Sequence, residues 1–382
     1  MLLACRHCFV PPTLFTAIAA STHPVVTPKY RTAVLNSLEL SHTVSAQRIG
    51  FDEGERASHQ LQRMQRLVAG RRRIAQASPP GQPNRIIYSA NGAQARGTPV
   101  RHEGSPDLPV SNTNPEYATA INEAYDGLGT VYDFYWQQFN RNSIDDAGLQ
   151  LAATVHYGQQ YDNAYWNGQQ MIFGDGDQVT FTRFTDSYDV VGHELTHGVT
   201  QYEAGLIYWG ETGALNESIS DVFGTLVKQF AYGQSVDKAD WLIGNNIMEP
   251  LPAQHAPNAV RTAIRSMAAP GTAYMNDPVL GTDPQPAHMN NYVRTMQDNG
   301  GVHTNSGIPN HAFYLAATSL GGNAWETVGP VWYQTLKSPA LSKTAKFQDF
   351  AALSVETASA LDASGNSAQA VATAWSQVGI ST

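Results

Sequence analysis

The feature that most constrains this chain is the sequence HELTH at positions 193–197. In an α-helix, residues four apart lie one turn apart on the same face, so the two imidazoles of this sequence can bind one metal ion. Val191, Leu195 and Val199 recur at the spacing of an opposite, apolar face. The segment therefore predicts a buried helix with a metal site on one side and core packing on the other.

Glu217, twenty residues after the second histidine, is a third candidate ligand. Its stretch has apolar residues at helical spacing, and Asp221 follows one turn later on the same face. A catalytic zinc ion usually binds three protein side chains and leaves one position open, so His193, His197 and Glu217 form the expected zinc site. Five-residue motifs also arise by chance, and histidine pairs often have structural roles, but the second helix favours zinc. Glu194 is then the natural base for the metal's water, and Asp221 can fix the tautomer of a ligand histidine.

These two segments and a third, DNGGVHTNSG at positions 298–307, resemble the thermolysin family of zinc metallopeptidases in order and spacing. The resemblance covers roughly residues 85–382. It implies an α+β fold with a sheet-rich domain at 85–205, which includes the HELTH helix, and a mainly helical domain at 206–382. The zinc site would lie in the cleft between them. The implied activity is that of a zinc-dependent endopeptidase made as a zymogen.

The resemblance also assigns roles to residues around the metal. Tyr208 and His303 match the donors that stabilise the oxyanion, and Asp298 matches the carboxylate that orients and charges His303. Asn216 is expected to contact a ligand histidine. Glu194 would take a proton from water and pass it to the leaving nitrogen.

Substrate contacts are implied in the same way. Asn163 and Ala164 match the edge-strand segment that pairs with a substrate backbone, and Arg265 matches the arginine that binds a substrate carbonyl. Five apolar residues are expected to line the pocket beyond the scissile bond, and they predict cleavage on the N-terminal side of hydrophobic residues. The alternative that they are plain core residues stays open. They are Phe181, Phe184, Val190, Ile243 and Ile264.

The chain departs from better-known members of the family at the calcium positions. Asp189 and Asp240 are retained, but Lys228 stands where an acidic ligand is expected, and asparagines at 245 and 246 replace an acidic pair. Calcium sites rely on several carboxylates, and an ammonium group cannot bind the ion. We therefore expect at most one calcium ion, with Lys228 able to pair with the two carboxylates instead.

The first 84 residues differ in charge from the rest of the chain. They hold ten lysines and arginines against four acidic residues, a net charge of +6, whereas the remainder has 13 against 28, a net charge of −15. This complementarity indicates a partner within one chain, and the sequence FVPPTL at 9–14 resembles the short propeptide of the protealysin-type subgroup. We expect residues 1–84 to be an inhibitory propeptide and linker, cut within or near the proline-rich segment 78–84. Nucleic-acid binding by the arginine-rich run at 63–73 is disfavoured, because no nucleic-acid motif accompanies it.

Both cysteines, Cys5 and Cys8, precede the FVPPTL motif. A thiolate from either could cap the open zinc position, or the motif could block the cleft sterically with free thiols. No apolar run reaches the ~18–20 residues that a membrane helix needs, and Arg6 interrupts the start of a signal peptide. We expect a monomeric cytoplasmic zymogen without a membrane segment, with non-standard secretion as the route to the extracellular space.

The residue pattern predicts the secondary structure coarsely. A strand starts at residue 85, a helix spans 112–139, and strands at 149–157 and 169–173 flank a turn at Asn167-Gly168. The later chain is mostly helical, with helices expected at 213–232, 257–267, 304–320, 324–336, 346–360 and 366–377.

Two further classes of protein stay open. One is a zinc-binding protein without activity, which is disfavoured because every catalytic residue type is present. The other is an aminopeptidase, which would need a group that binds the substrate's free amine, and the sequence shows no signature of one. Hydrolysis of N-terminally blocked peptides separates an endopeptidase from an aminopeptidase.

Overall fold

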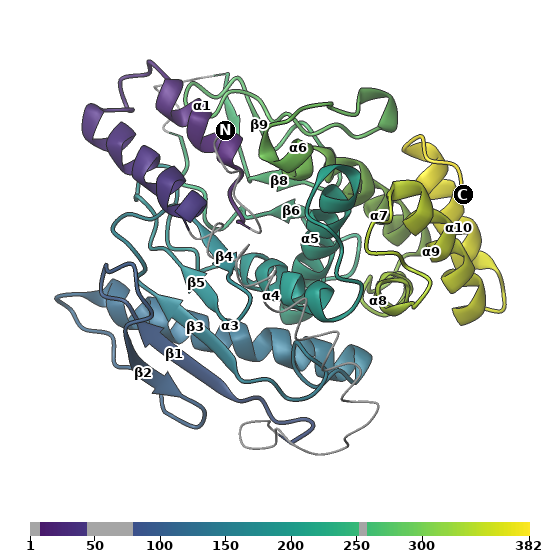
Figure 1. Ribbon diagram of the computed structural model, residues 1–382, viewed down its shortest axis with the longest axis horizontal. Helices are drawn as coiled ribbons and strands as arrows, with labels where there is room; N and C mark the ends of the chain where they lie inside the picture. The colour runs from purple at the N-terminus through teal and green to yellow at the C-terminus, as the bar shows by residue number, and fades with distance from the viewer. Residues whose placement is uncertain (1–7, 44–78, 252–257) are drawn as a thin grey trace.

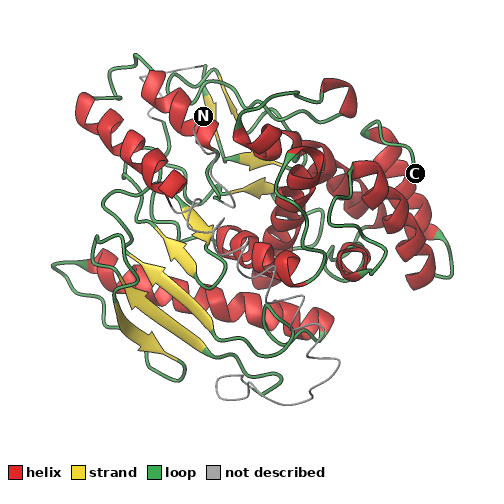
Figure 2. Ribbon diagram, viewed as in Figure 1, coloured by secondary structure: helices red, strands yellow, loops and turns green. Residues whose placement is uncertain are grey.

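The computed structural model describes residues 8–43, 79–251 and 258–382 (Figure 1). Cys5, the arginine-rich run and Ser78 lie outside them. Figure 2 shows the larger sheet on one side of the molecule and a group of helices on the other. The expected division into a sheet-rich half and a helical half is confirmed.

The first half is built on a five-stranded sheet in the order β2-β1-β3-β5-β4. β1 is antiparallel to β2 and parallel to β3, β3 is parallel to β5, and β4 is antiparallel to β5. Helix α3 (Pro115–Phe139) packs against β1 and β3, and β4 is the edge strand that contacts the HELTH helix. The strands are β1 (Arg85–Ser89), β2 (Thr98–His102), β3 (Leu151–Val155), β4 (Ala164–Trp166) and β5 (Met171–Phe173).

The second half is mainly helical, and helix α4 (Tyr188–Tyr202) joins it to the sheet. α4 packs against α5 (Gly210–Tyr232), which lies at the centre of the molecule in Figure 1. Two short antiparallel pairs follow, β6 (Leu242–Ile243) with β8 (Arg265–Ser266) and β7 (Val260–Arg261) with β9 (Tyr274–Met275). The remaining elements are the 3-10 turn η1 (Met289–Asn291) and helices α6 (Asp298–Asn305), α7 (Gly307–Leu320), α8 (Gly329–Lys337), α9 (Phe347–Leu361) and α10 (Asn366–Gln377).

The expectation of a helix at 257–267 is wrong, because the described part of this segment, residues 258–267, forms β7 and β8. Its backbone groups bond to other segments: Thr262 N–H donates to Ala273 O and Ile264 N–H to Ile243 O. Strand pairing thus overrides the local pattern. The helix expected at 324–336 begins instead at Gly329, because Pro330 belongs in a first helical turn rather than an interior. β4 forms where the residue pattern gave only a connecting segment, although the family resemblance already implied an edge strand there.

Residues 8–43 bridge the two halves on the upper side of Figure 1. They contain α1 (Pro12–Ala20), with proline at its first position, and a second helix at 28–43. Ser21 Oγ donates to Pro278 O at 2.7 Å in the second half, and Ser41 Oγ lies 2.9 Å from Tyr161 Oη in the first. Phe9 and other apolar side chains of this segment are buried in the main core, so the segment is an integral part of the fold.

Candidate active site

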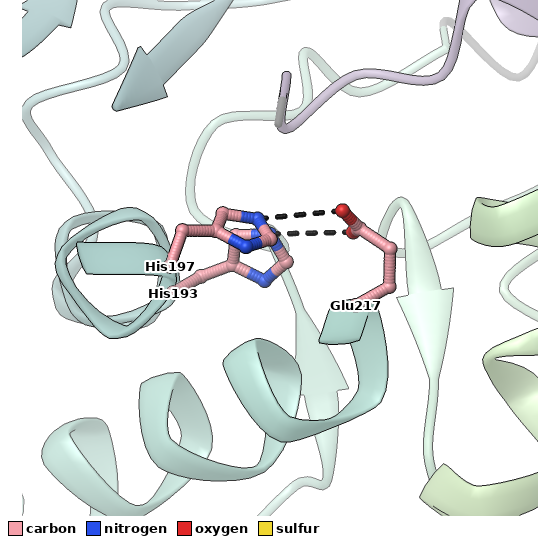
Figure 3. Close-up of side chains that lie close together, drawn as sticks. All are labelled: His193, His197 and Glu217. Carbon is pink, nitrogen blue, oxygen red and sulfur yellow. Dashed lines mark hydrogen bonds and ion pairs between the residues drawn. The ribbon is translucent and has the colours of Figure 1, made fainter. Parts of the chain in front are cut away.

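Two glycines allow the HELTH helix to approach α5 closely. A methyl group on Gly224 of α5 would lie 2.5 Å from the backbone oxygen of Asp189, and one on Gly192 would lie 3.0 Å from Gly224 Cα. Real side chains do not tolerate the first contact, so position 224 requires glycine, and the second is tighter than most real contacts, so glycine at 192 keeps the two helices close. The close approach brings Glu217 on α5 opposite the two histidines of α4, as Figure 3 shows.

The three expected ligands converge. His193 Nε2 lies 3.1 Å from His197 Nε2, and the Glu217 carboxylate lies 3.4 Å from the first and 3.3 Å from the second. The other ring nitrogens have partners, with Asp221 Oδ1 2.8 Å from Nδ1 of His193 and Asn216 Oδ1 2.9 Å from Nδ1 of His197. If each Nδ1 donates its proton, two Nε2 lone pairs face one another, an arrangement that a cation between them stabilises. All three side chains are buried, and they fit a zinc ion.

The pKa values of the two ligand histidines shift in opposite directions. Burial lowers the pKa of His197 to about 4. Burial also disfavours charge on His193, but its hydrogen bonds to Asp221 and Glu217 outweigh this and raise its pKa to about 9. Asn310 Nδ2 and the Arg265 guanidinium both donate to Asp221, at 2.8 and 2.7 Å, and so hold it in place. The sequence gave no signal for Asn310.

Tyr208 and His303 also contact the Glu217 carboxylate. The Tyr208 hydroxyl donates to Glu217 Oε1 and lies 3.3 Å from His303 Nε2. Asp298 Oδ1 lies 2.6 Å from His303 Nδ1, and Asp298 Oδ2 accepts the His303 backbone N–H at 2.9 Å. Burial opposes charge on His303, but the charge of Asp298 outweighs it and raises the pKa to about 9. Three left-handed residues at 299–301 form the tight turn between these two side chains.

The residues expected to bind substrate hold the chain's own N-terminal segment. Phe9 N–H donates to Ala164 O at 3.0 Å, and Asn163 accepts Val10 N–H at 2.9 Å. Arg265 donates to Phe9 O at 3.1 Å. Cys8 forms an antiparallel β-bridge with Tyr165 of β4. Residues 8–10 therefore extend the sheet at its β4 edge, as strand addition of a peptide would do.

The Phe9 ring packs next to the HELTH helix. It is fully buried, and its centroid lies 5.2 Å from that of His193 in an edge-on contact. A methyl group on Gly244 would lie 2.9 Å from this ring, so glycine leaves room for it; sequence reasoning missed this residue. The five expected pocket residues are buried in the main hydrophobic core, as Phe9 is, and one of them, Ile264, lies beside Gly244 as the Phe9 ring does. They are Phe181, Phe184, Val190, Ile243 and Ile264.

The calcium positions hold an ammonium group. Lys228 Nζ lies 3.0 Å from Asp240 Oδ1 and 3.4 Å from Asp189 Oδ2, and it donates to Asn245 Oδ1 at 2.7 Å and Leu242 O at 3.1 Å. Burial disfavours its charge, but the two aspartates raise its pKa. The lysine ammonium group thus occupies the position between the oxygens that a calcium ion would need as ligands.

Comparisons with known proteins agree with this geometry. Residues 81–201 match the thermolysin metallopeptidase catalytic domain, and residues 204–380 match the thermolysin metallopeptidase alpha-helical domain. The chain belongs to the thermolysin family of metallopeptidases. It is a zinc-dependent metalloprotease, and the resemblance stated from its sequence motifs is confirmed.

Individual relatives cover most of the chain. An extracellular metalloprotease of Pectobacterium carotovorum subsp. carotovorum is 52% identical over 303 residues, which are 79% of this chain and 82% of that protein. Protease PrtS of Photorhabdus sp. (strain Az29) is 47% identical over 78% of this chain and 76% of its own length. The precursor of protealysin, a metalloproteinase from Serratia proteamaculans, has the same fold at a TM-score of 0.80 and 45% identity, covering 98% of this chain and 99% of that one. This likeness to a precursor supports the zymogen form.

Proposed function

We propose that this protease is an endopeptidase that cleaves on the N-terminal side of hydrophobic residues, and that residues 1–84 inhibit it until they are removed. The observation that carries the proposal is the position of residues 8–10. They bind to the substrate-binding residues with a phenylalanine ring in the apolar pocket and a backbone carbonyl beside His303. Residues 8–10 thus bind in the way that we propose for a peptide substrate of the enzyme.

The roles of the side chains follow from their positions. When bound by His193, His197 and Glu217, zinc supplies a Lewis acid that polarises a carbonyl group and acidifies water. Glu194 is buried on the same helix, and its Oε2 accepts the backbone N–H of Trp166 at 2.8 Å, which orients the carboxylate. Glu194 takes a proton from the attacking water and returns it to the leaving nitrogen.

The oxyanion and the substrate backbone have separate partners. His303, charged by Asp298, and the Tyr208 hydroxyl donate hydrogen bonds to the oxyanion. Arg265 and Asn163 hold the residues that follow the scissile bond, as they hold Phe9 and Val10. The pocket around Phe9 then selects a hydrophobic side chain, since burying such a group is worth ~1.5–3 kcal/mol.

The N-terminal segment inhibits by occupation of the cleft. Of the two mechanisms considered, the contacts favour steric blocking over a thiolate on zinc. The Cys8 sulfur is disulfide-bonded and packs in a small cluster with tyrosines at 157, 161 and 165, whereas its backbone carbonyl faces His303. Residues 79–82 of the linker are exposed, which supports cleavage there.

We infer a monomer that binds peptides or proteins and reaches the extracellular space, as the name of the Pectobacterium relative suggests for that protein. No helix of the described residues is long and apolar enough to cross a membrane.

The test is incubation of the zinc-loaded chain, followed by mass spectrometry and digestion of a library of blocked peptides. We expect the chain to shorten by roughly eighty residues as activity rises. Cuts should precede Leu, Phe or Ile in peptides without a free amine. A requirement for a free amine would point to an aminopeptidase, and a preference for Asp, Glu or Lys after the cut would contradict the pocket assignment.

A further inference from the structure

One peptide bond of the N-terminal segment lies at the catalytic centre. The carbonyl oxygen of Cys8 accepts a hydrogen bond from Nε2 of His303 at 2.8 Å. His303 is the donor assigned to the oxyanion, and Tyr208 lies 3.3 Å from the same nitrogen. The Cys8 carbonyl therefore occupies the position where negative charge develops during hydrolysis.

The next carbonyl is held elsewhere. Phe9 O accepts from Arg265, whose guanidinium is also anchored on Asp221 at 2.7 Å. Val10 N–H and its carbonyl bond to the Asn163 side chain at 2.9 and 3.4 Å. These contacts fix both direction and register, because each carbonyl of residues 8–10 has a different partner. Of the bonds between residues 8 and 10, only Cys8–Phe9 has its carbonyl beside the oxyanion donors.

The side chains agree with this register. The Phe9 side chain, which would follow the cut, is fully buried, with its ring beside His193 and Gly244. Phe9 N–H, the nitrogen that would leave, donates to Ala164 O at 3.0 Å and is held in the cleft. Residues 8–10 are thus bound in the orientation and register that hydrolysis requires, with a hydrophobic residue directly after the scissile bond.

We propose that the enzyme hydrolyses its own Cys8–Phe9 bond, as a processing step separate from cleavage of the linker. This inference rests on the proposed endopeptidase function. The oxygen of a water molecule adds to the Cys8 carbonyl carbon, and Glu194 takes the water proton. The C–N bond breaks, Glu194 returns the proton to the nitrogen, and the products are a Cys8 carboxylate and a Phe9 amine.

This cut trims the propeptide without releasing it. Phe9 keeps its pocket and its bond to Arg265, and α1 and the helix at 28–43 keep their own contacts. Ser21 stays bonded to Pro278 O and Ser41 to Tyr161. The trimmed chain therefore still blocks the side of the cleft that binds residues after the scissile bond, and activity rises only after the linker is cut.

The positions of the cysteines provide a direct assay. Both cysteines of the chain lie within residues 1–8, so after reduction a thiol-reactive dye labels only that octapeptide. Zinc-loaded wild type, Glu194→Ala and Phe9→Asp are incubated, reduced, labelled and separated by mass. In wild type we expect the dye to move to a peptide that ends at Cys8. Glu194→Ala should keep the dye on the full chain, and Phe9→Asp should release the octapeptide at least about tenfold more slowly, from the loss of ring burial. Phe9→Leu, which still fills the pocket, is the matched control.

A synthetic peptide tests the same bond without a folding variant. A blocked peptide with the sequence of residues 6–13 should be cut between its cysteine and phenylalanine by the active enzyme. If wild type hydrolyses an unrelated blocked peptide and cuts its linker, but the dye stays with Phe9 and the synthetic peptide remains intact, the inference is overturned. If no blocked peptide is hydrolysed at all, the endopeptidase function fails as well.

Discussion

Replacement of Lys228 by methionine should strongly destabilise the protein. The ammonium group is buried and is shared between Asp189, which is also buried, and Asp240, whose side chain is 38% exposed. Methionine matches the length of the lysine stem but leaves Asp189 without its cation. We take Asp189 as the main source of the effect, because an ion pair with a group as exposed as Asp240 contributes at most ~1 kcal/mol.

The magnitude follows from the burial of Asp189. Removal of one partner of a buried ion pair typically costs ~3–5 kcal/mol. Asp189 keeps two other donors, the Ser187 hydroxyl and Gly244 N–H at 3.1 Å, so we expect the lower end, about 3 kcal/mol. At ~2.1 cal/mol/K per residue, the 382 residues of this chain give an unfolding entropy of ~0.8 kcal/mol/K, so a loss of about 3 kcal/mol lowers the melting temperature by roughly 4 °C.

The assay is thermal unfolding in a Glu194→Ala background, which prevents self-digestion. Lys238→Met is the matched control, because that lysine is exposed. Lys228→Glu restores an acidic ligand, so millimolar calcium should raise its melting temperature while leaving wild type unchanged. The reasoning is refuted if Lys228→Met melts with wild type, or if calcium stabilises wild type as much as Lys228→Glu.

Three further predictions follow from other contacts. Phe9→Asp should weaken docking of the N-terminal segment by about 10- to 150-fold, because ring burial is worth ~1.5–3 kcal/mol, and the uncut chain should then hydrolyse a blocked peptide from the start of the assay. Gly224→Ala should force α4 and α5 apart, at a cost of ~1–3 kcal/mol, and lower the zinc content measured by metal analysis. Burial, and then the charge of Asp177, hold the pKa of Asp162 well above its ordinary value. This protonation stabilises the fold at low pH and is lost as the pH rises through the folded-state pKa, so Asp162→Asn should unfold like wild type in acid but at a higher temperature in alkaline buffer.

The zinc site could be predicted from sequence because its geometry is local. Spacing within one helix sets the positions of His193 and His197, and helical periodicity places Glu217 and Asp221 on one face. The approach of the two helices is not local. It depends on Gly224 and its contact with the backbone of Asp189, which no spacing rule reveals.

The sequence predictions that were wrong or incomplete concern segments whose structure depends on contacts with residues far away in the chain. Residues 257–267 have an apolar pattern compatible with a helix, but residues 260–261 and 265–266 pair with strands at 274–275 and 242–243. The sequence likewise identified the FVPPTL motif, but not that Phe9 enters the pocket or that the Cys8 carbonyl reaches His303. Those contacts arise only when the motif pairs with the edge strand β4.

The measurement that tests the central claim most directly is the rate of blocked-peptide hydrolysis by Glu194→Ala, with its zinc content determined on the same sample. The account predicts one zinc ion per chain in mutant and wild type alike, because Glu194 is not a ligand. It also predicts a loss of kcat of about 10²–10⁴, the usual contribution of a general base. A mutant that retains zinc and turns over at the wild-type rate would contradict the assignment of Glu194 as the base and the mechanism built on it.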